Sequence, residues 1–145
     1  HELYQQKKGI IGGTSAGAAV MSEIMITGDG DFGKLEKNNI VTANGFGFID
    51  NYIIDQHFVV RQRNNRLLNL VIEKNLVGIG IDESTAIMVY PDETIQVFGE
   101  GQVLIYDPQN AIPPKDNSSK LSTYGLKLSV LKEGDRFNIK TGKSL

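Results

Sequence analysis

The sharpest chemical signal in the sequence is a serine inside a run of small residues, Gly13-Thr14-Ser15-Ala16-Gly17. The run fits the G-x-S-x-G pattern of a nucleophile elbow, in which a tight turn between strand and helix exposes the serine hydroxyl. The helix that follows would offer backbone amides, such as that of Ala16, to an oxyanion. The alternative is a glycine-rich turn that only packs helix on strand or cradles a phosphate. We favour Ser15 as a nucleophile that attacks a carbonyl group.

A serine nucleophile needs a general base, and the two histidines of the sequence are His1 and His57. His57 follows a short apolar segment, Tyr52-Ile53-Ile54, which we expect to be a strand. The carboxyl ends of parallel strands share one sheet edge, so His57 would emerge beside Ser15. A lone histidine often has no catalytic role, but this position favours His57 as the base.

The histidine in turn needs an acid that fixes its tautomer. Asp82 and Glu83 follow another expected strand, and because side chains alternate along an extended chain, one of the two would face the site. The competing acids are Asp29, Asp31, Asp50 and Asp55. Asp55 stands two residues before His57 and would have difficulty turning back onto it. The chain order serine, histidine, acid differs from the α/β-hydrolase fold, in which the acid precedes the histidine.

Three arginines, Arg61, Arg63 and Arg66, stand at the start of an expected helix. Cations at a helix N-terminus oppose the helix dipole, so helix stability does not explain them. At about 100° per residue, Arg63 and Arg66 lie about 60° apart and could share one face. The planar guanidinium group suits a carboxylate. Their nearness to His57 favours carboxylate binding over a solvated basic face.

The composition excludes several other functions. The chain has 145 residues, 40% of them hydrophobic, which corresponds to about one domain with a buried core. A net charge of −2 gives no reason to expect a nucleic acid or an anionic membrane surface as partner. No apolar run approaches the ~18 to 20 residues of a membrane span. The absence of cysteine excludes disulfides, thiolate zinc sites and cysteine nucleophiles, and we expect no metal or cofactor.

The elements that must position these residues alternate between strand and helix in the first half of the chain. We expect the end of a polar helix at 3–8, a buried strand at 9–13, a helix at 16–23 and loops with a short hairpin at 27–47. A helix at 61–75 and a strand at 77–81 come next, and a meander of strands follows at 85–90, 94–98 and 102–106. The remaining segments are an exposed loop at 108–123, an edge strand at 126–131 and a polar tail at 140–145.

Alternating strand and helix units favour an α/β fold with three layers, in which a mostly parallel sheet is covered on both faces. The back half adds a β-rich, antiparallel extension. We expect residues 1–107 to form the C-terminal part of the main domain, residues 108–124 a flexible loop, and residues 125–145 a last strand and tail of that domain. The chain begins without Met and reads as a piece that lacks an N-terminal half.

Four blocks in this order resemble the cyanophycinase family of serine peptidases, which is related to aspartyl dipeptidase. The blocks are residues 12–19, residues 55–58, the arginines at 61, 63 and 66, and residues 78–83. The resemblance implies a fold like that of class I glutamine amidotransferases and exopeptidase cleavage of cyanophycin into β-aspartyl-arginine dipeptides. It implies Ser15 as nucleophile, His57 as base and Glu83 as acid. The substrate-binding residues that it implies are Asp55, Gln56, Arg61, Arg63 and Arg66.

Two other functions stay open at this point. One is an aspartyl or isoaspartyl dipeptidase of the same superfamily, and the other is a non-catalytic relative that binds peptides in the same pocket. We expect an acidic peptide or cyanophycin as the partner, no nucleic acid and no membrane, with a homodimer left open. The expected location is cytoplasmic, and a complete site would need the N-terminal segment.

Overall fold

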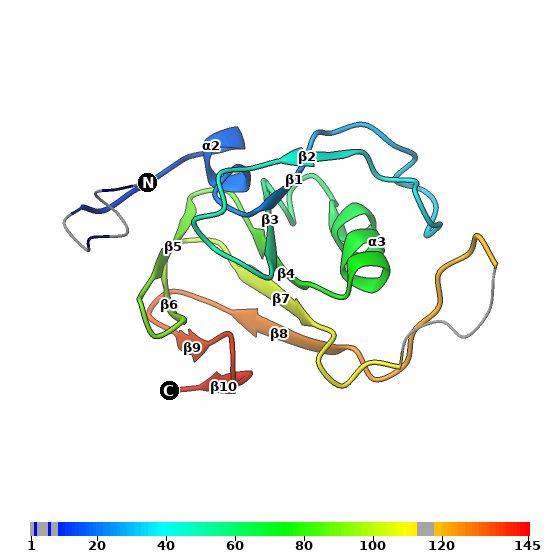
Figure 1. Cartoon of the computed structure of the whole chain (residues 1–145). Helices are drawn as coiled ribbons and strands as arrows, with labels where there is room; N and C mark the ends of the chain where they lie inside the picture. Colours follow the sequence, from blue (N-terminus) through cyan, green and yellow to red (C-terminus); the bar gives the residue numbers. More distant parts are fainter. Residues whose placement is uncertain (1, 3–5, 7–8, 113–117) are drawn as a thin grey trace.

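The computed structural model describes residues 2, 6, 9–112 and 118–145. Its centre is a four-stranded sheet with the strand order β3-β4-β7-β8 (Figure 1). These strands are β3 (Tyr52–Gln56), β4 (Val77–Ile81), β7 (Val103–Asp107) and β8 (Lys127–Leu131). Helix α3 (Asn64–Lys74) connects β3 to β4 and lies against one face of this sheet. In the β3-α3-β4 unit, the candidate base His57 follows β3 and the candidate acid Glu83 follows β4.

The central sheet is mostly antiparallel, so the expected three-layer fold with a mostly parallel sheet is wrong. Strands β3 and β4 are parallel, but β4 pairs antiparallel with β7, and β7 pairs antiparallel with β8. A parallel pair needs a long crossover connection, which the described elements supply only through α3. After β4 the chain continues through strands and turns, which bring it back in the opposite direction. The alternation of strand and helix therefore holds for one unit and not for the whole sheet.

A second sheet of four antiparallel strands, with the order β10-β9-β6-β5, packs on the other face of the central sheet. Its strands are β5 (Thr85–Val89), β6 (Thr94–Gly99), β9 (Arg136–Asn138) and β10 (Lys143–Ser144). The strands expected at 85–90 and 94–98 are confirmed. The polar tail expected at 140–145 contains β10, because this short strand pairs with β9.

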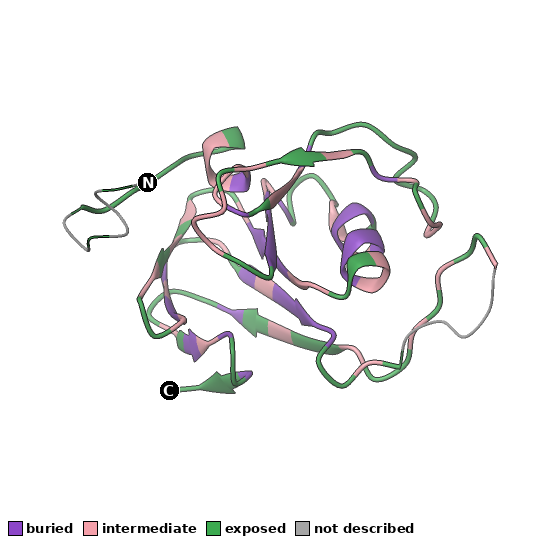
Figure 2. Ribbon diagram, in the orientation of Figure 1, coloured by how far each residue is buried: buried purple, intermediate pink, exposed green. Residues whose placement is uncertain are grey.

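Two clusters of buried apolar side chains occupy the two faces of the central sheet. In Figure 2, much of β3 and α3 has the colour of buried residues. On β3, Ile54 belongs to the cluster shared with the second sheet and Ile53 to the cluster shared with α3, as the alternation of side chains along a strand requires. Leu67 and Val71 of α3 are fully buried, which confirms the helix expected from the apolar spacing of 61–75, but the helix begins at Asn64, so Arg61 and Arg63 precede it. The edge strand expected at 126–131 is confirmed as β8.

A short helix and a two-stranded antiparallel ribbon lie beside β3 at one end of the molecule (Figure 1). They are α2 (Ala16–Ala19), β1 (Ile24–Ile26) and β2 (Thr42–Asn44). The helix expected at 16–23 is therefore much shorter than the pattern indicates. The hairpin expected within 27–47 is only partly right, since β2 lies in that segment but β1 ends before it. In the part of the chain that the structure describes, every helix is too short or too polar to span a membrane.

The buried strand expected at residues 9–13 is wrong. These residues form no strand and are exposed, and Ile10 reaches 95% exposure. None of the described strands pairs with this segment, so its apolar side chains have no sheet to enter. The helix end expected at 3–8 falls mostly outside the described residues, as does the 113–117 part of the expected loop.

Candidate active site

Ser15 lies at the turn that leads into α2. Its backbone has φ 53° and ψ −122°, and a positive φ is uncommon for a residue with a side chain. The N–H of Gly17 donates to the carbonyl of Thr14 at 2.8 Å and closes the turn. A Cβ at Gly13 would lie 2.1 Å from the carbonyl oxygen of Gly17, so this position accepts only glycine. The strained turn exposes the Ser15 side chain, as in nucleophile elbows.

His57 follows β3 directly and contacts Ser15. Its Nε2 lies 3.0 Å from the Oγ of Ser15, which is 42 positions away in the sequence. Strand β3 lies beside α2, so the end of the strand meets the turn that carries the serine (Figure 1). The backbone of His57 also has a positive φ, 50°, which turns the chain sharply after the strand. At this distance the serine hydroxyl can donate to an unprotonated Nε2.

Glu83 contacts the other ring nitrogen of His57. Its Oε1 lies 2.5 Å from His57 Nδ1. The parallel register pairs Gln56 with Ile81, so residues that follow β3 and β4 emerge at the same edge of the sheet. With a proton on Nδ1, the ring donates to Glu83 and leaves Nε2 free to accept from Ser15. The side chains of His57 and Glu83 are 22% and 45% exposed, so solvent reaches this chain of contacts.

The other candidate acids have different partners in the structure. The Oδ1 of Asp82 accepts the backbone N–H of Val59 at 3.0 Å and that of Val60 at 3.1 Å. The sequence left both Asp82 and Glu83 as candidates for the acid that contacts His57. In the structure Asp82 binds backbone amides, and Glu83 contacts the imidazole. The sequence reasoning missed this role of Asp82, because nothing in its spacing identifies backbone amides as its partners.

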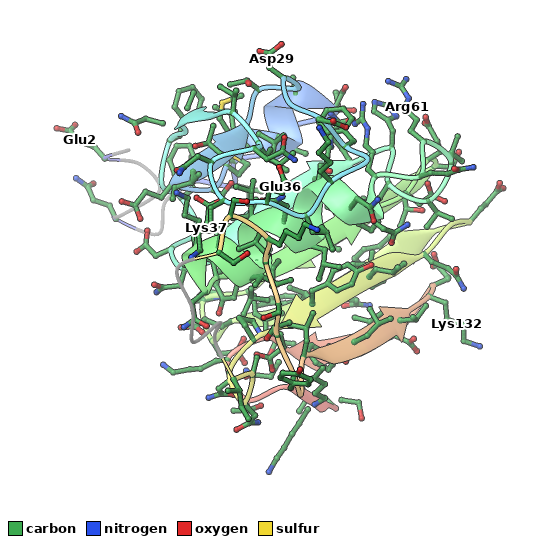
Figure 3. The ribbon with its side chains drawn as sticks, turned by 90° about the vertical axis from the view of Figure 1, so that its right-hand side faces the viewer. Glu2, Asp29, Glu36, Lys37, Arg61 and Lys132 are labelled. Atoms are coloured by element: carbon green, nitrogen blue, oxygen red, sulfur yellow. The ribbon has the colours of Figure 1, made fainter. Side chains whose placement is uncertain are left out.

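The remaining acids lie away from the imidazole or are paired elsewhere. Asp31 forms an ion pair with Lys34 at 2.9 Å, and Asp29 accepts the hydroxyl of Thr27 at 3.3 Å. In Figure 3, Asp29 lies at the margin of the molecule. Asp50 precedes β3 and so stands at the opposite end of that strand from His57. Among the acids considered, Glu83 is the one that the structure brings to His57.

Asp55 and Arg66 form a buried ion pair between β3 and α3. The Nε of Arg66 donates to Oδ2 of Asp55 at 2.6 Å, and its Nη2 donates to Oδ1. The two residues are 1% and 5% exposed, respectively. A bidentate pair of this kind is strong, and removal of one partner leaves a buried charge. The resemblance implies substrate binding for both residues, but here their polar atoms face each other inside the molecule.

The other three residues of the implied substrate-binding set lie closer to the surface. They are Gln56, at the end of β3, and Arg61 and Arg63, in the turn that follows. The Nη1 of Arg63 donates to the backbone carbonyl of Gln56 at 2.6 Å, directly before His57. Burial, and then the charge of Arg66, lowers the pKa of Arg63 from its ordinary value. The Oε1 of Gln56 is buried and has no hydrogen-bond partner among the described residues. Arg61 is exposed at the periphery of the molecule (Figure 3), so its charged group is open to a ligand.

The residue after His57 is held by packing on β4. Phe58 is fully buried, and its ring forms an edge-to-face contact with Tyr106, with centroids 6.2 Å apart. A Cβ at Gly80 would lie 2.3 Å from the Phe58 ring. Only glycine at this position leaves room for Phe58, which anchors the turn of the base. Glycine inside a strand pattern is a signal for such a close approach, although the sequence does not reveal the neighbour.

An apolar pocket of about 450 Å³ lies beside the elbow. Its lining residues are Ile11, Gly12, Gly13, Gly17, Val20, Met21, Phe46 and Phe48. The rings of Phe46 and Phe48 form an edge-to-face contact, with centroids 5.9 Å apart. Within the described ranges, no group of three or more His, Asp or Glu side chains could hold a metal ion.

Known relatives of this chain were found among curated proteins. The cyanophycinase of Thermosynechococcus vestitus is 37% identical over 146 aligned positions, which cover 97% of this chain and 45% of the relative. The cyanophycinase of a Nostoc species is 39% identical over 134 positions, with 89% and 45% covered. That of Geminocystis herdmanii is 42% identical over 140 positions, with 90% and 50% covered. The chain thus spans about half the length of the curated relatives it matches.

The chain also matches the model of peptidase family S51. The match extends over residues 2–97, which is more than half of the chain and includes the contacts among Ser15, His57 and Glu83. The matched region also includes Arg61 and Arg63 of the turn after β3 and Arg66 of α3. By this match and by the similarity to three cyanophycinases, the chain belongs to peptidase family S51.

Proposed function

We propose that a protein containing this chain is a serine-type exopeptidase that hydrolyses cyanophycin and releases β-aspartyl-arginine dipeptides. The observation that carries the proposal is the unbroken contact from the Ser15 hydroxyl through the His57 imidazole to the Glu83 carboxylate. Membership of family S51 and the names of the three relatives support it. Because the chain spans about half the length of these relatives, the activity is proposed for the whole protein.

In the proposed acylation step, Ser15 Oγ attacks the carbonyl carbon of the peptide bond while His57 Nε2 accepts the hydroxyl proton. Glu83 accepts the hydrogen bond from Nδ1 and stabilises the positive charge on the ring. The backbone N–H of Ala16, which follows the nucleophile, donates to the developing oxyanion. His57 then protonates the leaving amine, the C–N bond breaks, and the acyl group remains on Ser15 as an ester.

The proposed deacylation step repeats these roles with water as the nucleophile. His57 accepts a proton from water as the water oxygen attacks the ester carbonyl. The C–O bond to Ser15 breaks, and the proton returns from His57 to Ser15 Oγ. The products are a free carboxylic acid and the starting hydroxyl, so the three side chains end in their original state.

We propose that the basic turn after His57 recognises the acidic backbone of the substrate. Exposed Arg61 supplies a guanidinium group for a substrate carboxylate, and Arg63, whose side chain is 16% exposed, is the second donor. Three further residues belong to the proposed substrate-recognition set but support it from inside the molecule: Gln56, Asp55 and Arg66. Their contacts hold the turn in the shape that presents Arg61 and Arg63 to the substrate.

The central test replaces the nucleophile in the whole protein. Ser15→Ala should abolish release of β-aspartyl-arginine from cyanophycin, because no other group replaces the attacking oxygen. The matched control is Ser144→Ala, an exposed serine on β10, which should keep full turnover. Circular dichroism should show the same fold for both variants. Retained turnover in Ser15→Ala would remove this residue from the mechanism.

Two assays on the whole wild-type protein distinguish the proposed function from the two other functions. Hydrolysis of short aspartyl or isoaspartyl dipeptides without cleavage of the polymer would indicate a dipeptidase. A serine-directed acylating reagent should modify Ser15 in a peptidase and leave a purely peptide-binding relative unmodified. Labelling of the wild-type protein together with polymer cleavage is the outcome that our proposal requires.

The proposal also includes a segment outside this chain that pairs with residues 9–13. Ile10 is 95% exposed, Ile11 lines the apolar pocket, and the relatives are about twice as long as this chain. Such a segment would cover these apolar side chains and complete the surroundings of the elbow. A cytoplasmic location and a homodimer belong to the same proposal and are checked by cell fractionation and by light scattering of the whole protein.

A further inference from the structure

The turn between His57 and Arg63 has an unusual backbone that needs support. His57 and Gln62 have φ values of 50° and 52°, in the left-handed region. Residues with side chains adopt this strained region only where surrounding contacts impose it. The position of the His57 ring depends on this backbone, since a rotation at the end of β3 moves the ring away from both of its partners.

Backbone hydrogen bonds hold most of the turn, including one from the N–H of Phe58 to the carbonyl of Ile81 at 3.2 Å, but the amides of Val59 and Val60 donate to a side chain. The N–H of Arg61 donates to the carbonyl of His57 at 3.2 Å, and that of Arg63 donates to the carbonyl of Phe58 at 3.0 Å. The N–H groups of Val59 and Val60 both donate to Oδ1 of Asp82. Asp82 is thus the side chain that holds the two residues between Phe58 and Arg61.

Asp82 is itself held firmly at the end of β4. Its N–H donates to the carbonyl of Gln102 at 3.1 Å, beside the start of β7. A Cβ at Gly101 would come within 3.2 Å of the Asp82 Cβ and within 2.7 Å of the Glu83 carbonyl oxygen, so glycine leaves room for both acids. The carboxylate is therefore fixed relative to the central sheet, and its charge strengthens both hydrogen bonds.

We propose that Asp82 is a positioning residue that fixes the backbone of the His57 turn, while its neighbour Glu83 fixes the imidazole ring. Of these two consecutive acids, Asp82 accepts the amides of Val59 and Val60 in the turn that follows His57, and Glu83 contacts Nδ1 of the ring. Loss of Asp82 frees two amides and lets His57 leave the space between Ser15 and Glu83. The predicted effect on turnover rests on the proposed function, but the effect on the position of the ring does not.

The test compares three variants in the whole protein. Asp82→Ala removes both hydrogen bonds, whereas Asp82→Asn keeps an oxygen that can accept them. The control, Asp92→Ala, removes an acid whose Oδ1 accepts the N–H of Thr94 at 3.0 Å in the β5–β6 turn. The readouts are kcat and KM on cyanophycin, the melting temperature, and the low-field proton resonance of His57 Nδ1–H.

Asp82→Ala should lower kcat about 10- to 100-fold with KM changed less than about threefold, because a displacement of about 1 Å in a catalytic group has effects of this size. The His57 Nδ1 resonance should broaden or disappear. Asp82→Asn should restore the resonance and bring kcat within about threefold of wild type, since a neutral acceptor keeps the geometry with weaker bonds. Asp92→Ala should leave kcat and the resonance unchanged.

Two results would overturn the inference. One is Asp82→Ala with wild-type kcat and an unchanged resonance. The other is equal losses of kcat and of the resonance in Asp82→Ala and Asp92→Ala, which would indicate general destabilisation. If the proposed function is wrong, the wild-type protein does not cleave cyanophycin. In that case, loss of the His57 resonance in Asp82→Ala and its return in Asp82→Asn still support the positioning role.

Discussion

Each ring nitrogen of His57 has a different partner, and this difference decides what the imidazole can do. Glu83 accepts from Nδ1, so the proton of the neutral ring is held on that nitrogen and Nε2 is left as the acceptor. Nε2 in turn is the atom that contacts Ser15. Neutral imidazole in this tautomer is the form that removes a proton from a serine hydroxyl.

Glu83→Gln tests the role of the negative charge. The substitution keeps the size of the side chain but removes the charge and introduces an NH₂ group that favours the wrong tautomer of His57. We expect kcat to fall by up to about 10⁴-fold, the size of the effect of neutralising the acid of a serine-histidine-acid triad. KM on the same substrate should change little, since Glu83 contacts His57 and not the proposed substrate-binding arginines.

The matched control for this prediction is Glu100→Gln, which removes an exposed acid in the β6–β7 turn. Its kcat should remain at the wild-type value, and its free energy of unfolding should change by about 0.5 kcal/mol or less. Wild-type kcat in Glu83→Gln would show that the carboxylate charge does not contribute to turnover.

At the scale of elements, the β3-α3-β4 unit places the base and the acid at one sheet edge. The parallel register brings the ends of β3 and β4 together, and the buried pair of Asp55 and Arg66 joins β3 to α3. Glycines in β4 allow the close approach that parallel strands and their helix need. Gly78 faces Leu67 and Val71 of α3, and Gly80 faces Phe58.

Gly80→Ala tests this close packing. The added Cβ would lie 2.3 Å from the Phe58 ring, which is buried and cannot move freely. We expect the free energy of unfolding to fall by about 1–3 kcal/mol, the usual effect of overpacking, measured by urea denaturation.

The control for overpacking is Gly33→Ala, whose Cβ would meet only the Asp31 carboxylate, at 3.2 Å. This carboxylate is the end of an exposed side chain, so stability should change by about 0.5 kcal/mol or less. Equal stability of Gly80→Ala and wild type would mean that Phe58 can repack without cost.

At the scale of the whole molecule, a central sheet is covered by α3 on one face and by a second sheet on the other (Figures 1 and 2). This two-sided core holds the ends of β3 and β4 rigidly. The elbow lies outside it, because residues 9–13 are exposed and pair with none of the described strands. Ser15 is therefore fixed by α2 and by its contact with His57.

Hydrogen exchange of the whole protein tests whether residues 9–13 pair with another segment. If they do, the backbone amides of Ile10 and Ile11 should exchange about as slowly as those of β4, because paired amides exchange only through opening. The amides of residues 28–30, in an exposed loop, serve as the fast-exchanging reference. Fast exchange at both isoleucines would remove the proposed pairing.

The features that depend on local spacing could be predicted from the amino-acid sequence. The G-x-S-x-G run identified the strained turn at Ser15, and the apolar spacing after residue 61 identified α3. The position of His57 after one strand, and of two acids after the next, placed these residues at a common edge. These features are visible in a sequence because turn chemistry and helix periodicity depend on residues that are close along the chain.

The direction in which the strands pair, and the choice of which charged groups meet, could be read only from the folded molecule. β7 returns antiparallel because no crossover helix precedes it, although its apolar residues suit either direction. The residues alone left Asp82 and Glu83 as alternatives, and the resemblance implied Glu83. The structure shows that one holds amides and the other the imidazole. Such pairings depend on contacts between residues far apart in the sequence, and these contacts form only when the whole chain folds.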